Sequence, residues 1–253
     1  MKRILFISII LFFATTINAQ QFISKAVIEY EVKTSIKKTM SNDSWADMLK
    51  DNMSEFKTAY YLYTFADNKS IYKFDRWDPK TKIPAWYKQD DEENIWHYDF
   101  NTGKVNIQKQ IEGAKLNIAD SIPAIEWKLT NENREIAGFN CRKAIGKIMD
   151  SVYVFAFYTD EITIPGGPCS ISGLPGVILG MTIPRLYTSY IATKVMVTGV
   201  NEAEIKPAPS KKYYSYASLK SLVEEKTKEW YSWGDDKEEN KRMKNLFLWN
   251  AFL

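Results

Sequence analysis

The chain has 253 residues, of which 45% are hydrophobic and 14% aromatic, so it can bury a sizeable core and is not disordered as a whole. Lysine and arginine number 34 against 31 acidic residues, and the two signs are mixed along the chain, which excludes the one-sided basic face that nucleic-acid binding needs. His97 is the sole histidine, so a zinc site built from several imidazoles is excluded as well.

The first nineteen residues have the three-part form of an export signal. Lys2 and Arg3 precede an apolar run over residues 4–17, and the small residue Ala19 closes the segment. An uncleaved membrane anchor is the alternative, but a run of about fourteen residues falls short of the roughly twenty that span a bilayer. No cysteine follows the run to carry a lipid. We therefore expect a periplasmic or otherwise exported protein with no transmembrane segment after cleavage.

Strand patterns begin directly after this segment. Ile28, Tyr30 and Val32 alternate with charged residues, which is the period of a half-buried strand. Capping oxygens in residues 42–44 then precede an apolar spacing near 3.6, which predicts a helix carrying Trp45, Met48, Leu49, Met53 and Phe56 on one face. Aromatic alternation predicts the next strands at 61–65, 72–74 and 96–100, and a turn at 101–103 leads into a hairpin strand with Val105 and Ile107.

Shorter strands follow at a spacing of about ten residues. They are predicted at 124–129, 140–148, 151–158, 177–183 and 187–198. After Pro207 and Pro209 the pattern becomes helical: residues 221–224 have the form of a capping box, and a second helix is predicted over 237–249. The residues on one face of the first of these helices are Leu219, Leu222, Val223 and Trp230.

These patterns predict a mainly β fold of the α+β type. We expect residues 20–206 to form a curved antiparallel meander sheet or half-barrel with one N-terminal helix. The C-terminal helices, within residues 207–253, should pack on the sheet, because an aromatic-rich face left in water would invite association.

Glycine and proline are concentrated between residues 165 and 184, which hold five of the eleven glycines and four of the nine prolines. Glycine permits positive φ and close backbone approach, whereas proline presets φ, so this segment is predicted to be a stiff, specified turn and not a linker. It contains no nucleophile–base pair, phosphate cradle or metal ligand set. We single out five of its residues as candidate binding residues that shape one edge of a site: Pro168, Gly173, Leu174, Pro175 and Gly176.

Catalytic and cofactor patterns are scarce. Residues 70–73 match Ser-x-x-Lys but lie in an aromatic strand without companion motifs, and there is no Gly-x-Ser-x-Gly elbow. His97 lies in a predicted strand, which favours a histidine on a sheet face over a metal ligand. Glycine patterns for phosphate are absent, and the acidic run 90–93 lacks the alternating ligands of a calcium loop. We predict no catalytic residue, metal or cofactor, although a carboxylate pair for glycoside hydrolysis stays possible among the 31 acidic residues.

Cys141 and Cys169 remain in a compartment that we expect to be oxidising, so we predict that they form a disulfide. Closing a loop of about 29 residues would restrict the unfolded chain by roughly 3 to 4 kcal/mol. It would also tie the glycine- and proline-rich segment to the strand at 140–148. The alternative is two unpaired thiols, one buried and one reactive.

Residues 173–179 read Gly-Leu-Pro-Gly-Val-Ile-Leu, which resembles the signature of the GLPGLI family of exported Bacteroidetes-type proteins. Upstream of this stretch, the sequence has Trp127 and then the stretches 136–144 and 156–162, in the family's usual order. Cys169 stands where an aromatic residue is common in the family, which supports a local disulfide, and Val177 replaces the more usual leucine. The resemblance implies an exported, β-rich envelope protein and supplies no catalytic residue. A helix followed by a long aromatic meander also looks like the curved open sheet of periplasmic lipoprotein carriers.

The expected function is binding of an apolar ligand or a partner protein by the curved sheet, and an enzyme is the less favoured class. Aromatic strands and the lack of catalytic groups support this expectation. One alternative is a carboxylate-based hydrolase acting on envelope glycan or peptide, which needs two buried acids about 5 to 9 Å apart facing one pocket. Another is a glycan-binding module, which needs at least two coplanar aromatic rings facing solvent.

Overall fold

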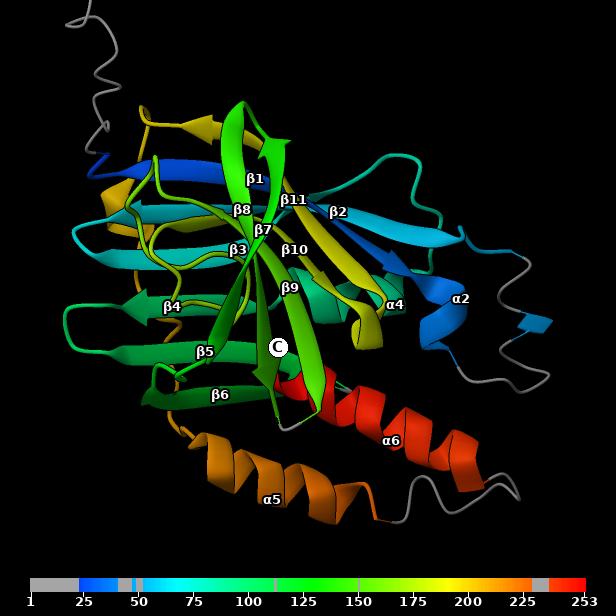
Figure 1. The fold of residues 1–253 in the computed structure, drawn as a ribbon. Coiled ribbons are helices and arrows are strands. Elements are labelled where there is room, and N and C mark those ends of the chain that lie inside the picture. Colours follow the sequence, from blue (N-terminus) through cyan, green and yellow to red (C-terminus); the bar gives the residue numbers. More distant parts are fainter. Residues whose placement is uncertain (1–22, 41–46, 49–51, 112, 150, 229–236) are drawn as a thin grey trace, which may run out of the picture.

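The computed structural model describes residues 23–40, 47–48, 52–111, 113–149, 151–228 and 237–253. They contain one antiparallel sheet of eleven strands in the order β6-β5-β4-β3-β2-β1-β11-β10-β9-β8-β7 (Figure 1). The strands are β1 (Ala26–Ser35), β2 (Phe56–Ala66), β3 (Lys69–Trp77), β4 (Ile95–Asp99), β5 (Lys104–Ile111), β6 (Ala114–Ser121), β7 (Trp127–Ile136), β8 (Phe139–Ile148), β9 (Val152–Thr159), β10 (Val177–Ile183) and β11 (Thr188–Met196). β1 joins the two halves of the sheet because it pairs with both β2 and β11. The predicted mainly β meander is therefore confirmed.

Helices are few and short. They are α2 (Ile36–Thr39), α4 (Ala85–Glu92), α5 (Tyr216–Lys226) and α6 (Lys237–Phe252), with 3₁₀ turns η1 (Pro184–Leu186) and η2 (Glu202–Glu204). The capping box of α5 is formed by Ser215 and Ser218, so the predicted box at residues 221–224 is wrong and lies inside the helix. Within the described ranges, no helix combines the length and apolar composition that crossing a bilayer requires.

The predicted N-terminal helix falls largely on residues 41–46 and 49–51, outside the described residues. Phe56, which the spacing put on that helix, instead begins β2 and pairs with Ser35 of β1. The export signal likewise lies outside the described residues.

The sheet curls strongly but does not close. Its edge strands, β6 and β7, are consecutive in the chain and are joined by residues 122–126 alone. In a flat sheet, ten strand spacings of about 4.8 Å would put these edges about 48 Å apart. A connection of this length reaches only about 20 Å. The sheet must therefore bend until β7 to β9 pass in front of β3 to β6, as Figure 1 shows, while β6 and β7 remain unpaired in the described sheet.

The edge of the sheet at β6 is covered by the chain that leads into α5. Tyr214 forms a parallel bridge with Ile118, and its amide donates to the Asn117 carbonyl at 2.8 Å. The first amide of α5, on Tyr216, donates to the Asp120 carboxylate at 2.9 Å, where a negative charge also suits the helix dipole. These contacts anchor α5 against β6, and α6 lies beside α5 (Figure 1).

The concave face of the sheet carries the aromatic core. Tyr30, Tyr63 and Tyr72 are among the largest fully buried side chains. The Tyr72 ring stacks on Tyr61 with centroids 5.1 Å apart and contacts the Trp96 ring at 5.3 Å. The alternating aromatic residues of β2, β3 and β4 are therefore core residues.

The part of the glycine- and proline-rich segment that precedes β10 packs across this concave face. The Tyr63 hydroxyl donates to the Pro165 carbonyl at 2.5 Å, and Trp127 Nε1 donates to the Ser172 carbonyl at 3.0 Å. Gly176 has φ +149°, and a Cβ there would lie 2.0 Å from the Thr159 carbonyl oxygen. Only glycine fits that close approach, so the prediction of a specified, packed segment is confirmed.

Candidate functional site

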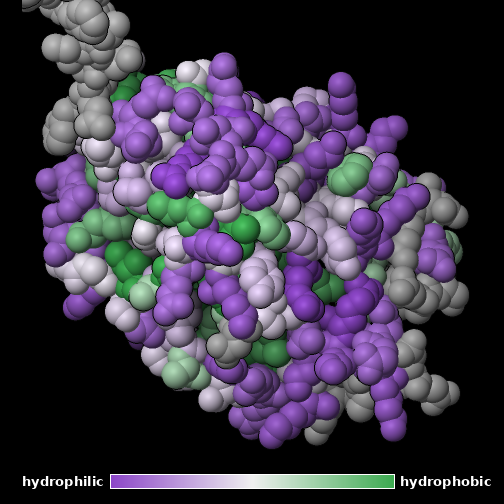
Figure 2. Space-filling model, in the orientation of Figure 1, coloured by the Kyte–Doolittle hydropathy of each residue, from purple (hydrophilic) through white to green (hydrophobic). Residues whose placement is uncertain are grey.

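The face of the molecule seen in Figure 2 is mainly hydrophilic, and its hydrophobic side chains gather in hollows near the middle. Two cavities are the candidate sites: a large cavity of about 1200 Å³ and a small cavity of about 310 Å³. The glycine- and proline-rich segment contributes to both, because Ser170 lines the large cavity and Cys169 lines the small one.

The large cavity lies between the connection that joins β6 to β7 and the two C-terminal helices, and Lys128 of β7 also lines it. Residues 123–126 and the ends of β8 and β9 line one side, and α5 and α6 line the other. Ile171 and Leu253, which are 1% and 4% exposed, form an apolar part of the lining. The Ser170 hydroxyl donates to the Phe252 carbonyl at 3.3 Å, which holds the end of α6 against the packed segment.

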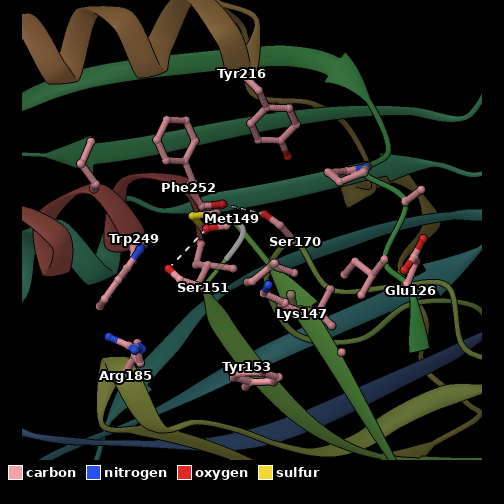
Figure 3. A pocket seen from close by; sticks show the side chains of 18 of the residues that line it. Glu126, Lys147, Met149, Ser151, Tyr153, Ser170, Arg185, Tyr216, Trp249 and Phe252 are labelled. Atoms are coloured by element: carbon pink, nitrogen blue, oxygen red, sulfur yellow. Dashed lines mark hydrogen bonds between the residues drawn. The ribbon is translucent and has the colours of Figure 1, made fainter. Parts of the chain in front are cut away.

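Aromatic rings and cations share the lining of the large cavity. Figure 3 shows Tyr216 and Trp249 on one side of the space and Tyr153 and Lys147 on the other. The Arg185 guanidinium lies 5.3 Å from the centroid of the Trp249 ring, a cation–π distance. Burial raises the pKa of Tyr216 to about 12, so its hydroxyl is a neutral hydrogen-bond donor. Such a lining suits a molecule with an apolar body and a negatively charged group.

The small cavity lies at the centre of the concave face, beneath α4 and α6. Lys57 on β2 reaches it and pairs with Asp91 of α4 at 2.5 Å between Nζ and Oδ2. The Tyr61 hydroxyl donates to the same carboxylate at 3.3 Å. Burial acts to lower the pKa of Lys57, but the charge and hydrogen bond of Asp91, with Tyr87 and Asp90, together outweigh it and leave that pKa above its ordinary value.

A second lysine of the small cavity, Lys109 on β5, is only 7% exposed. Its Nζ lies 4.8 Å from the centroid of the Trp96 ring. Burial lowers the pKa of Lys109, and the nearby Cys169 and Asp91 oppose that shift. The Cys169 thiol hydrogen-bonds to the Tyr190 hydroxyl at 3.6 Å, and burial raises the pKa of the thiol to about 11.

The predicted disulfide between Cys141 and Cys169 is wrong, because both cysteines are free and buried. Cys141 lies on β8, and its thiol donates to the Phe139 carbonyl at 3.5 Å. Cys169 contacts Tyr190 on β11, and β9 and β10 separate β8 from β11 in the sheet. Burial raises the pKa of Cys141 to about 12, so neither thiol is readily ionised at neutral pH.

The five candidate binding residues do not come together around either cavity. Pro168, Leu174 and Gly176 are buried in the packed segment, whereas Gly173 and Pro175 are exposed. None of the five lines the large or the small cavity in the part of the chain that the structure describes. Their neighbours in the segment, residues 169–171, take that place instead.

The acidic run 90–93 is part of α4 and its C-terminal cap and does not form a calcium loop. Asp91 pairs with Lys57, the Glu92 carboxylate accepts a hydrogen bond from Trp77 Nε1 at 2.6 Å, and Glu93 pairs with Lys115 at 2.5 Å. Among the described residues, no group of three or more histidine, cysteine, aspartate or glutamate side chains could hold a metal ion.

Few of the described side chains are placed for acid–base catalysis. His97, predicted on a sheet face, is 5% exposed there, and burial lowers its pKa. The carboxylates at the large cavity belong to Glu126 and Glu224, which are exposed and half-buried, so no pair of buried acids is brought together there within the described ranges. Asp90 at the small cavity is exposed, and Asp91 is engaged by Lys57. Nothing in the described residues positively indicates enzyme activity.

Sequence reasoning missed Lys57 and Lys109. Both continue an inward-facing alternation: Lys57 precedes Ala59 and Tyr61 on β2, and Lys109 follows Val105 and Ile107 on β5. A lysine at a core position of an apolar face was the available signal. The large cavity had no comparable signal, because distant elements form it.

Fold and cavities together define a class: an open, strongly curled antiparallel sheet with two binding-sized cavities on and beside its concave face. The chain matches no family model and no curated protein. Among solved structures it is similar to PNGF-II in two crystal forms. In the C2 form the TM-score is 0.51 at 13% identity over 78% of this chain, and in the P21 form 0.50 at 14% over 79%.

The likeness to PNGF-II concerns the fold alone. This chain covers 32% and 33% of the PNGF-II chains, about a third of their length. A conserved uncharacterised protein from Thermus thermophilus has a TM-score of 0.38 at 9% identity, over 75% of this chain and 89% of that one. That score is too low to support an argument.

Proposed function

We propose that this chain is an exported envelope protein of the GLPGLI type that binds an amphipathic ligand, with an apolar body and a negatively charged group, in the large cavity and does not transform it. The observation that carries the proposal is the lining of that cavity, which combines buried apolar residues such as Ile171 with the cations Lys147 and Arg185. Signal-like residues 1–19 and the glycine-rich signature support the export and the family.

A small molecule fits this site better than a partner protein does. Ligand cavities of proteins typically measure about 300 to 1000 Å³, concave and mostly apolar with a few polar groups. At about 1200 Å³ the large cavity has room for one such molecule. An apolar body that loses about 300 Å² of exposed surface would gain roughly 7 kcal/mol before the costs of association.

The test is displacement of a sulfonated hydrophobic dye from delipidated protein by a long-chain fatty acid, with the matching fatty alcohol as the uncharged probe. Wild type should bind the acid more tightly than the alcohol. Lys147→Gln should reduce that preference, whereas Lys104→Gln, an exposed lysine on β5 that does not line the cavity, should preserve it.

A pair of tyrosines provides a matched control for the apolar contact. Tyr153 is 51% exposed and lines the large cavity, and Tyr213 is 44% exposed and lies outside it. Tyr153→Ser should weaken fatty-acid binding about three- to tenfold, and Tyr213→Ser should leave it unchanged. Absence of binding by wild type, or equal effects of the two tyrosine variants, would overturn the proposal.

A further inference from the structure

The small cavity holds a cation in an unusual place. Lys109 continues the inward face of β5 that Val105 and Ile107 begin, and it is buried to 93%, with 7% of its surface exposed. Within the described part of the chain, its ammonium makes no hydrogen bond or ion pair, and its close contact is the Trp96 ring at 4.8 Å. Burial of this side chain costs free energy, because it removes part of the water around the ammonium, which still reaches the cavity, and no protein anion is paired with it.

The nearest carboxylate does not compensate this charge. Asp91 is held by Lys57 at 2.5 Å and by the Tyr61 hydroxyl at 3.3 Å. The lysine–aspartate pair is locally neutral. The other carboxylate of the lining, Asp90, is exposed and forms no ion pair with Lys109 within the described residues, so the Lys109 ammonium is left without a paired anion although the lining as a whole has no net charge. The cavity therefore favours an anion at the Lys109 ammonium.

Other polar atoms around the small cavity also lack partners. Three of its lining side chains have a buried nitrogen or oxygen atom without a hydrogen-bond partner: Tyr72 Oη, Trp96 Nε1 and Gln110 Oε1. Two of these three can donate, so together with Lys109 the set is rich in donors. Buried polar groups are normally satisfied, and such a set points to a missing acceptor.

The volume of the small cavity and its apolar lining limit the kind of molecule that can carry this acceptor. The volume of about 310 Å³ lies at the lower end of small-molecule sites. It corresponds to about ten water molecules at roughly 30 Å³ each. Val32, Leu186 and Leu246 contribute apolar walls, and the exposed Asn250 and Asp90 lie where the cavity meets the surface.

We propose that the small cavity binds a small organic acid with one carboxylate and an apolar body, whose carboxylate accepts a hydrogen bond from the Lys109 ammonium. This site adjoins the large cavity, with which it shares Leu253, but its polar groups are different ones. Lys109 does not line the large cavity, and Cys169 and Ser170 face different cavities from adjacent positions. The inference therefore does not depend on the proposed function, and each can fail alone.

Calorimetric titration of the full-length mature chain tests the inference. The probes are benzoate and 4-methylpentanoate as carboxylates with an apolar body, benzyl alcohol as the uncharged counterpart of benzoate, and inorganic phosphate as an anion without an apolar body. At least one carboxylate should bind, and the alcohol and phosphate should bind at least tenfold more weakly or not at all.

Lys109→Met should reduce carboxylate affinity at least tenfold, and Lys109→Arg should retain part of it because the charge remains. Lys104→Met on the same strand is the matched control and should bind as wild type does, since Lys104 is exposed and outside the cavity. Circular dichroism of each variant confirms that it is folded. The proposal is overturned if no carboxylate binds, if phosphate binds as well as benzoate, or if Lys109→Met binds like wild type.

Discussion

Replacing Lys109 by methionine should make the protein more stable, although most substitutions of buried residues destabilise. Lys109 is 7% exposed and its ammonium has no ion pair within the described residues. Methionine has a similar volume and no charge, so the variant removes the cost of the buried cation and keeps the packing. We expect a gain of about 1 to 3 kcal/mol in the free energy of unfolding. For a domain of this size that raises Tm by roughly 2 to 10 °C.

The gain from Lys109→Met should depend on pH. Burial lowers the pKa of Lys109 in the folded protein below its ordinary value of 10.5. Cys169, Asp91 and Asp90 act against this shift, and the Lys57 charge adds to it. Below the folded-state pKa the wild type bears the whole cost of the buried charge. As pH rises towards 10.5 that cost disappears, so the advantage of the variant should be largest near neutral pH and shrink in alkaline solution.

Lys57→Met is the matched comparison, because Lys57 lies on the same concave face and differs in having a partner. Removing it leaves Asp91 partly buried without its ion pair, so we expect a loss of about 1 to 3 kcal/mol. Urea unfolding of both variants at neutral and alkaline pH, followed by circular dichroism, measures the two effects. A destabilised Lys109→Met, or two variants that change stability in the same direction, would refute the reasoning.

Three further results are expected. Gly176→Ala should lower the free energy of unfolding by about 3 kcal/mol or more, or prevent folding, because the new Cβ would meet the Thr159 carbonyl. Gly199→Ala is the control: at φ +74° with nothing within 4 Å, it should lower that free energy by only about 1 kcal/mol in thermal unfolding. Thiol titration without reductant should find two thiols in the unfolded chain and only slowly reacting thiols in the folded protein. If no thiol is found after unfolding, the two cysteines form a disulfide and the structure is contradicted on this point. Trp127→Phe should cost about 1 kcal/mol in urea unfolding through loss of its hydrogen bond to Ser172, and an unchanged midpoint would contradict that role.

Local patterns in the sequence were sufficient for much of the sheet. The strand predicted at 177–183 coincides with β10, and the alternation of Ile28, Tyr30 and Val32 lies within β1. The strand predicted at 124–129 was only partly correct, because β7 runs from Trp127 to Ile136 and residues 124–126 belong to the connection that lines the large cavity. β6 was missed, although Leu116 and Ile118 alternate there with Lys115 and Asn117 in the period of a half-buried strand.

The sequence by itself determined that the chain would form a curved antiparallel sheet and that residues 165–184 would have a specified backbone shape. The sheet follows from the alternation of apolar and polar side chains, and the shaped segment follows from the φ preferences of glycine and proline. Both are local properties, because they depend on residues that are close together in the sequence. Tertiary structure alone decided that Cys141 and Cys169 stay apart, that a cavity forms between the β6–β7 connection and the C-terminal helices, and that Lys109 is buried without a paired anion. These depend on strand order and on how far the sheet curls, because both bring together residues that no local pattern connects.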